Sequence, residues 1–185
     1  MNQENRGFYG DLVRDCKFGL GFPLTNESLD AIMAGLEPNA NDKILAVAGC
    51  GDQAFALLEK AGIVVVSDIN PTQLDLIRER KEALSSGDSL KFILPTDTDF
   101  ELHGSIYRVN YFNDEKRLTL IQKNLPNLII NGPKSLEDYA KEQMFTKIYA
   151  SDAIGENYCK NSLEVHLVQV LKGLEKDGLL YVANG

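Results

Sequence analysis

Short runs of β-branched and other apolar residues alternate with segments of helical periodicity along most of this chain. The runs Ile44–Ala48 and Ile63–Val66 are each followed by a stretch in which apolar residues recur every three or four positions, the spacing of one face of a helix. Uninterrupted apolar runs are typical of parallel strands that are buried on both faces. The alternation therefore predicts an α/β fold, in which helices cover a parallel sheet.

The same periodicity predicts five strands in all. The remaining strands and the two longest helices are expected at residues 90–94, 145–150 and 179–183, and at residues 71–84 and 163–174, the last helix being largely buried. A doubly wound, Rossmann-like sheet with the strand order 3-2-1-4-5 accommodates this succession. We predict one such domain over residues 1–185.

Two segments fall outside the alternation. Residues 1–42 are expected to form an N-terminal helical cap, with Thr25 as the N-cap of a helix that contains Leu29. Residues 95–144 exceed the usual crossover length between strands three and four, so they predict an insert over the carboxyl edge of the sheet. Such an insert is either a lid or substrate pocket, or a set of extra helices that patch the sheet, and the sequence leaves both open.

The end of the chain predicts an interface. Gly185 follows directly after the expected strand at residues 179–183, which lies at an edge in the predicted strand order. Proteins normally cover such an edge. We therefore expect either that the last strands of the sheet are missing from this chain or that two copies form a homodimer through the strand-five edge.

The charge balance narrows the choice of partners. The chain carries 19 Lys and Arg against 27 Asp and Glu, a formal net charge of −8, which argues against nucleic acid or an anionic membrane surface as a partner. No apolar stretch reaches the ~20 residues that span a bilayer, and the N-terminus lacks the apolar core of a signal peptide. We expect a soluble, cytoplasmic protein with no integral membrane segment.

The cysteines and histidines predict no metal centre. Cys16, Cys50 and Cys159 lie far apart and lack the paired spacing of zinc or redox dithiol sites. The two histidines, His103 and His166, have no ligand partners close in sequence, so they are expected to be ordinary surface or half-buried side chains.

The most informative segment is the turn after the first strand. Gly49 and Gly51 end that strand, and the next helix begins with its N–H groups aimed at the same place. Asp68 ends the second strand, where a carboxylate can accept hydrogen bonds from a ribose diol. In this context the glycines predict a site for an adenosine-type ligand, the alternative being a tight turn beside a solvated carboxylate.

The nature of the nucleotide depends on Asp52. Residues 49–54 also satisfy the dinucleotide pattern G-x-G-x-x-A, but a pyrophosphate at this helix N-terminus would meet the Asp52 carboxylate. The ammonium and sulfonium of S-adenosylmethionine are cationic, so the same acid would favour that ligand. S-adenosylmethionine is therefore preferred over NAD.

Residues 44–54 and 66–74 resemble the nucleotide-binding half of S-adenosylmethionine-dependent methyltransferases. More narrowly, the glycine-Asp turn followed by Asp68-Ile69-Asn70-Pro71 is similar to the betaine-lipid type of S-adenosylmethionine:diacylglycerol 3-amino-3-carboxypropyltransferase. The sequence departs from the common G-x-G-x-G pattern at Gln53, where the third glycine would stand.

The resemblance implies a role for several side chains. Gly49, Gly51 and Asp52 would surround the methionine portion, and Asp68 would hold the ribose hydroxyls. Ile69 and Asn70 would lie along the adenine, with Asp97 near its amino group. Ser151 and Asp152 would face the reaction centre.

These expectations combine into a transferase. It would move a methyl or a 3-amino-3-carboxypropyl group from S-adenosylmethionine to a small-molecule or lipid acceptor. The sulfonium is already activated, so no catalytic residue is demanded, although Asp152 or Tyr158 could act as a base. The alternatives are an NAD(P)-dependent oxidoreductase and a non-catalytic nucleotide-binding domain.

Overall fold

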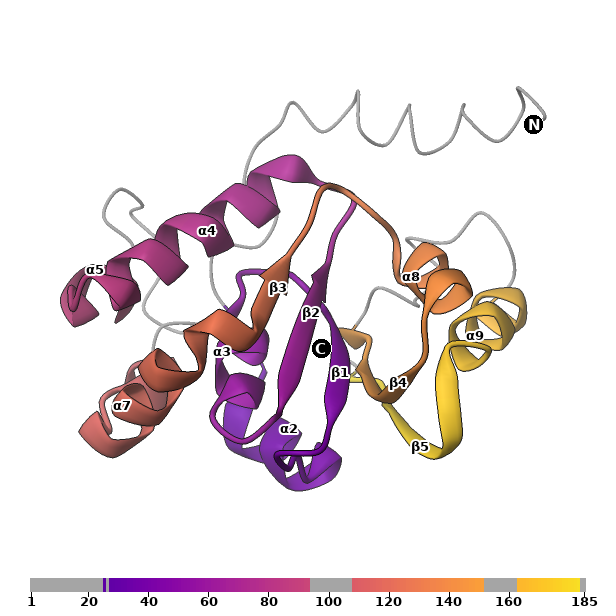
Figure 1. Ribbon diagram of the computed structural model, residues 1–185, viewed down its shortest axis with the longest axis horizontal. Helices are drawn as coiled ribbons and strands as arrows, with labels where there is room; N and C mark the ends of the chain where they lie inside the picture. Colours follow the sequence, from indigo (N-terminus) through magenta and orange to yellow (C-terminus); the bar gives the residue numbers. More distant parts are fainter. Residues whose placement is uncertain (1–24, 26, 94–107, 152–162, 184–185) are drawn as a thin grey trace.

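Five parallel strands form one sheet in the order β3-β2-β1-β4-β5 (Figure 1). The computed structural model describes residues 25, 27–93, 108–151 and 163–183. The strands are β1 (Lys43–Val47), β2 (Ile63–Ser67), β3 (Leu128–Ile130), β4 (Phe145–Tyr149) and β5 (Leu174–Tyr181). This order confirms the predicted α/β, Rossmann-like doubly wound sheet.

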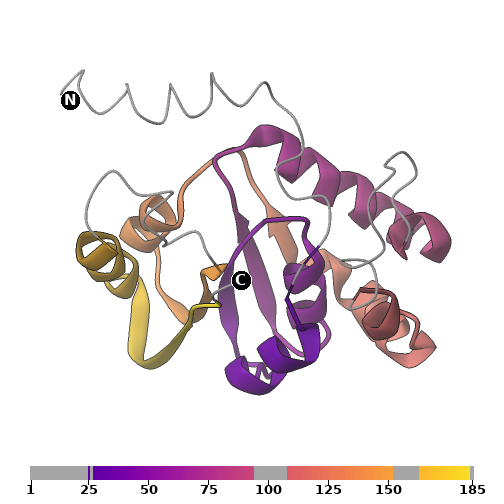
Figure 2. The ribbon, with the colours of Figure 1, turned by 180° about the vertical axis from the view of Figure 1, so that it is seen from behind.

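The helices cover both faces of the sheet. They are α2 (Leu29–Leu36), α3 (Asp52–Leu58), α4 (Pro71–Ser85), α5 (Ser89–Ile93), α7 (Glu115–Asn124), α8 (Leu136–Glu142) and α9 (Leu163–Leu171), with the 3-10 turn η2 (Leu125–Asn127) before β3 and helical residues 108–112 before α7. Helices α2 and α3 cover one face of the sheet, which is turned toward the viewer in Figure 2. Helices α8 and α9 cover the other face beside β4 and β5.

Alternate residues of the central strand build two separate cores. Ile44 and Ala46 pack with α2, α3 and α4, while Leu45 packs with α8 and α9. Successive side chains of a strand point to opposite faces, so a strand with helices on both sides must be apolar throughout. This explains why the continuous apolar runs identified the first two strands correctly.

The third strand was predicted in the wrong place. Residues 90–93 of the run expected as a strand belong to helix α5. The side chain of Asp88 accepts a hydrogen bond from the N–H of Lys91 at 2.9 Å at the start of this helix. Phe92 then packs edge-on against Phe55 and Phe112. The third strand is β3, which lies within residues 95–144, so that segment is not an insert between strands three and four.

The C-terminal helix and strand also differ from the prediction. Helix α9 ends at Leu171 and β5 already begins at Leu174, with an irregular pairing opposite Phe145 and Lys147 of β4. The helix is not largely buried, because Val165, Val168 and Leu171 are exposed. Apolar residues occur on nearly every face of this helix, so the sequence did not indicate which face packs against the sheet. Strand β5 lies at the sheet edge, and the homodimer contact there stays a prediction.

The described part of the N-terminal cap is α2 with the residues just before it. Ser28, not Thr25, is the N-cap: its hydroxyl accepts a hydrogen bond from the N–H of Ala31 at 3.3 Å. Both serine and threonine cap helices well, so composition did not separate them. Residues 1–24 lie outside the described part.

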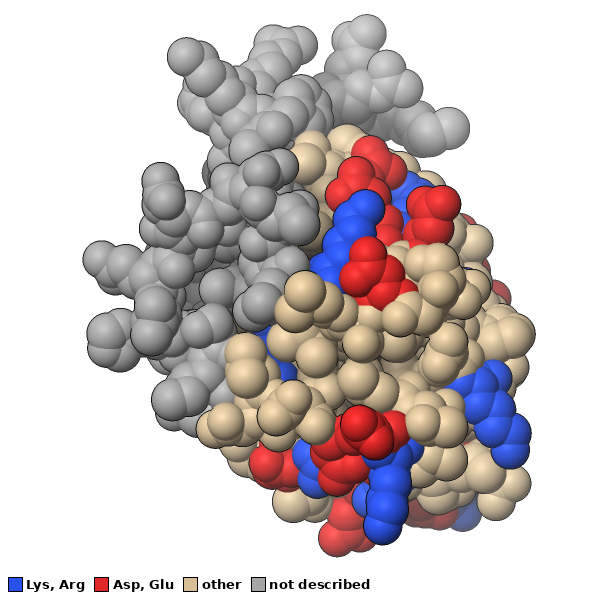
Figure 3. Space-filling model, turned by 90° about the vertical axis from the view of Figure 1, so that its left-hand side faces the viewer, with Lys and Arg blue, Asp and Glu red and all other residues tan. Residues whose placement is uncertain are grey.

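The surface carries both signs of charge. Figure 3 shows acidic and basic side chains next to one another at several places on one face, with uncharged surface between them. Ion pairs such as Arg78–Asp75, at 2.7 Å, contribute to this pattern. Among the described residues, no helix is both long enough and apolar enough to cross a membrane.

Candidate functional site

The glycine turn has the geometry that the sequence predicted. Gly49 and Gly51 both have a left-handed backbone, with φ of +46° and +86°, which favours glycine. A Cβ on Gly51 would lie 2.8 Å from Cγ1 of Ile77 on α4, whereas a Cβ on Gly49 would have Oε1 of Gln53, at 4.0 Å, as its nearest neighbour. Gly51 is thus required by packing, whereas no atom of the described residues lies closer than 4.0 Å to a Cβ on Gly49.

Asp68 lies against this turn. Its carboxylate accepts a hydrogen bond from the backbone N–H of Asn70 at 2.8 Å. The backbone N–H groups of Ile69 and Gly49 also lower the pKa of this carboxyl. The backbone of Asp68 is held in turn by Lys134, whose N–H donates to the Asp68 carbonyl at 2.7 Å. The structure therefore brings together the glycine turn and the acid that the sequence paired with it.

The two residues after Asp68 have different surroundings. Ile69 exposes 37% of its surface. The side-chain oxygen of Asn70 accepts a hydrogen bond from the N–H of Thr72 at 3.0 Å and so caps α4. Asn70 therefore has a structural task whether or not it also lies along an adenine.

Burial raises the pKa of Asp68 from 3.8 to about 6, although the backbone N–H groups partly oppose this. Between these values the folded chain holds a proton that the unfolded chain has lost, so the free energy of unfolding should fall as pH rises from about 4 to about 6. Replacing Asp68 with Asn removes this cost, and we expect the variant to gain roughly 1–2 kcal/mol over the wild type at pH 7 and almost nothing at pH 4.

Urea unfolding of both proteins at pH 4 and pH 7 measures this difference. Asp75→Asn, a change at an exposed acid on α4, is the control and should show no such pH-dependent gain. A gain for Asp68→Asn that is the same at both pH values would contradict the expected proton uptake.

Asp52 does not face an open ligand site, which corrects the sequence-based expectation. Its side chain is 0% exposed and contacts two guanidinium groups, Nη2 of Arg80 at 2.5 Å and Nε of Arg108 at 3.3 Å. The N–H of Thr25 donates to the other carboxylate oxygen at 3.3 Å, and so does the thiol of Cys50 at 3.0 Å. Burial alone would raise the pKa of Asp52, but the two arginines hold it below its usual range.

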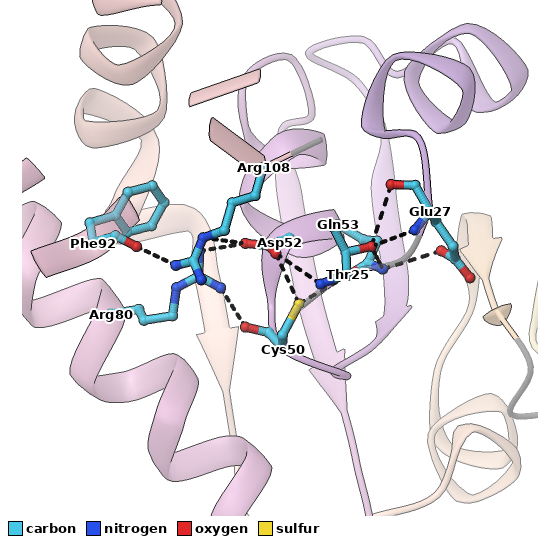
Figure 4. Close-up of polar contacts among 8 residues, drawn as sticks. All are labelled: Thr25, Glu27, Cys50, Asp52, Gln53, Arg80, Phe92 and Arg108. Carbon is cyan, nitrogen blue, oxygen red and sulfur yellow. Dashed lines mark hydrogen bonds and ion pairs between the residues drawn. The ribbon is translucent and has the colours of Figure 1, made fainter. Parts of the chain in front are cut away.

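The two arginines connect the glycine turn to helices α4 and α5 (Figure 4). Arg80 donates to the carbonyl of Cys50, and its guanidinium lies over the rings of Phe55 and Phe92, at 5.0 and 4.8 Å. Arg108 donates to the carbonyl of Phe92 on α5. Because Asp52 is paired with two guanidinium groups, this cluster carries a net charge of +1, and the carboxylate no longer favours a sulfonium over a pyrophosphate.

Glu27 is the site residue that the sequence analysis missed. It is 8% exposed and lies at the carboxyl ends of β1 and β4. Its carboxylate accepts hydrogen bonds from the hydroxyl of Tyr149, from Oγ of Ser151 at 2.6 Å and from Nε2 of Gln53 at 3.2 Å. A lone glutamate before a helix cap matches no motif, and only its contacts with β4 reveal it.

Ser151 reaches Glu27 by an unusual backbone conformation. Its φ is +45°, a backbone conformation that residues other than glycine rarely adopt and that often occurs at functional sites. The hydroxyl of Tyr149, two residues earlier, is buried, and burial together with the Glu27 contact raises its pKa. Ser151 thus lies beside Glu27 after the end of β4, and its place at a reaction centre stays a prediction. Asp97, Asp152 and Tyr158 lie outside the described residues.

No metal centre is formed by the described part of the chain. It contains no group of three or more His, Cys, Asp and Glu side chains that could hold a metal ion. Cys50 is buried, which raises the pKa of its thiol. His166 is also buried, and its Nδ1 contacts the carboxylate of Glu137.

Comparisons with known proteins support the fold and give no evidence on the function. No protein-family model and no curated protein matches the sequence. A crystal structure described as precorrin 8W decarboxylase, the product of gene MT0146 of Methanobacterium thermoautotrophicum, is similar with a TM-score of 0.51 and 14% sequence identity. The match covers 86% of this chain and spans 64% of that protein's length. That protein is an enzyme by its name.

Proposed function

We propose that this protein is an S-adenosylmethionine-dependent transferase. The observation that carries the proposal is that the glycine turn and Asp68 follow two paired parallel strands, β1 and β2, joined just before Gly49 and Asp68 by the bond from the N–H of Ala48 to the carbonyl of Ser67 at 2.8 Å. It places a carboxylate beside the glycine turn at the switch point of the sheet, where doubly wound folds bind nucleotides. Asp68 keeps acceptor capacity for a ribose diol, since a carboxylate offers about four lone-pair sites.

The charges around the turn favour a cationic ligand. Three acids, Glu27, Asp52 and Asp68, stand against Arg80 and Arg108, a balance of −3 + 2 = −1. Asp52 and the two arginines together carry +1, so Glu27 and Asp68 leave a net charge of −1 among the described residues at the turn. A pyrophosphate would be repelled there, whereas an ammonium or a sulfonium would be attracted.

For this reaction the protein mainly has to align the acceptor nucleophile with a carbon attached to the sulfonium. An acceptor nucleophile forms a bond to a carbon attached to the sulfonium, and the electron pair of the broken carbon–sulfur bond stays on sulfur as a neutral thioether. The methyl and the 3-amino-3-carboxypropyl carbon are both open to this attack, so the choice rests on which carbon the pocket aligns with the acceptor. The acceptor is a small molecule or a lipid.

Thermal unfolding in the presence of ligands tests the proposal. S-adenosylmethionine or S-adenosylhomocysteine at ~100 times its Kd should stabilise the chain by about 2.7 kcal/mol, a shift of several degrees. Asp68→Asn should lose most of this shift because the ribose diol loses a charged acceptor. Asp75→Asn, on the exposed face of α4, should keep it.

The same experiment separates the alternatives. A shift with NAD or NADP alone would show an oxidoreductase-type site and overturn the transferase proposal. The two arginines on Asp52 make that outcome worth testing, because their surplus positive charge would attract a pyrophosphate. No shift with any of the four ligands would also overturn it. Binding without transfer to any small-molecule or lipid acceptor would identify a non-catalytic binding domain.

A further inference from the structure

Glu27 is a buried acid whose side-chain hydrogen-bond partners among the described residues are all neutral. Its three side-chain donors are the hydroxyls of Tyr149 and Ser151 and the amide of Gln53. Among the described residues, no Lys, Arg or His forms an ion pair with Glu27. This differs from the buried Asp52, which contacts two guanidinium groups.

A buried carboxylate is costly to keep ionised without a positive partner. Three neutral donors offset part of that cost, but a carboxylate can accept about four hydrogen bonds. Glu27 therefore has capacity for one further donor, and a charged donor would give the largest gain.

The space beside Gly49 lies close to the Glu27 carboxylate. Gln53 connects the two: its Oε1 is the nearest atom to a Cβ built on Gly49, at 4.0 Å, and its Nε2 donates to Glu27 at 3.2 Å. The side-chain amide of Gln53 thus lies between the glycine turn and the Glu27 carboxylate; Figure 4 shows its contact with Glu27.

The surrounding contacts hold Glu27 in place. Thr25 accepts the N–H of Glu27 at 3.1 Å and the amide of Gln53 at 2.9 Å, and its own N–H donates to Asp52 at 3.3 Å. On the other side, the left-handed backbone of Ser151 directs its hydroxyl onto Glu27. Preorganisation of this kind is what a charged binding group requires.

We propose that Glu27 binds the α-ammonium group of the ligand's amino-acid arm. The inference rests on the proposed function, because it assigns one group of S-adenosylmethionine to one side chain of the same site. It gives Glu27 the role that the sequence suggested for Asp52. It also makes the protein selective for adenosine thioethers that carry a primary amine over those that lack one.

Calorimetric titration of the full chain tests this assignment with two probes. S-adenosylhomocysteine has the amino-acid arm, and 5′-methylthioadenosine has the same adenosine and sulfur without it. Glu27→Gln should raise the Kd for S-adenosylhomocysteine about 10- to 100-fold, the range for a hydrogen bond to a charged group. The Kd for 5′-methylthioadenosine should change by less than about threefold.

Glu59→Gln is the matched control. Glu59 is also largely buried and also accepts a hydrogen bond from a tyrosine hydroxyl, Tyr111 at 2.8 Å, but it lies at the opposite end of α3. Its replacement should leave both dissociation constants unchanged. Equal weakening of both probes by Glu27→Gln, or no weakening of either, would overturn the ammonium assignment while the proposed function stands.

A second measurement needs no variant. The des-amino analogue of S-adenosylhomocysteine should bind the wild-type chain about 10- to 100-fold more weakly than S-adenosylhomocysteine itself. Equal affinity would overturn the assignment even if Glu27→Gln failed to fold. If the wild type bound neither S-adenosylhomocysteine nor 5′-methylthioadenosine, the proposed function would fail and this inference with it.

Discussion

Asp52→Asn should lower the free energy of unfolding by about 3–5 kcal/mol, because it leaves two buried guanidinium groups without their counter-charge. Arg80 and Arg108 are almost fully buried and share one carboxylate oxygen of Asp52. Asparagine keeps the size and the hydrogen-bonding oxygen but loses the charge. Urea unfolding monitored by circular dichroism measures the effect.

Two further variants show whether charge is the cause. Asp75→Asn breaks an exposed pair with Arg78 and should change stability by less than about 0.5 kcal/mol. The double variant Asp52→Asn/Arg108→Met removes one of the uncompensated charges, so it should be more stable than Asp52→Asn alone. A mild effect of Asp52→Asn, comparable to that of Asp75→Asn, would mean that the two arginines do not depend on Asp52.

Gly51→Ala should destabilise the fold by about 2–5 kcal/mol. The φ of +86° costs a residue with a Cβ about 1–2 kcal/mol, and the new methyl group would lie 2.8 Å from Cγ1 of Ile77 on α4. Overpacking of a tight core adds about 1–3 kcal/mol. Thermal and urea unfolding measure the loss.

Gly87→Ala isolates the backbone part of this effect. Gly87 follows α4 with a similar φ of +82°, but a Cβ there would meet nothing within 4 Å. The expected loss is only about 1–2 kcal/mol. If the two variants were equally stable, contact with Ile77 would not contribute at Gly51, and the turn would be free to move away from α4.

The central part of the fold could be predicted because its signals are local. The strands β1 and β2 are apolar on both faces, and the glycine turn and α4 carry their own capping and turn residues. The edge strands gave weaker signals. β3 has three residues, and the apolar run at residues 90–94 looked like a better strand, although Phe92 packs into the aromatic core from a helix.

The candidate site was predicted only in part, for the same reason. Gly49, Gly51 and Asp68 follow their strands directly, so their place at the carboxyl edge was foreseeable. Asp52 is adjacent to the glycines in sequence, but its partners Arg80 and Arg108 come from distant segments. No pattern in the sequence indicated that they would enclose it, and Glu27 had no motif at all.

The contacts of Glu27 have a consequence for the order in which the protein is built. Its partners Tyr149 and Ser151 are 122 and 124 positions further along the chain, so this half of the site forms only by closing a long loop. Such contacts are slow to form because chain entropy opposes them. During synthesis the glycine turn and Asp68 leave the ribosome well before β4, so ligand binding should become available only when nearly the whole domain has been made.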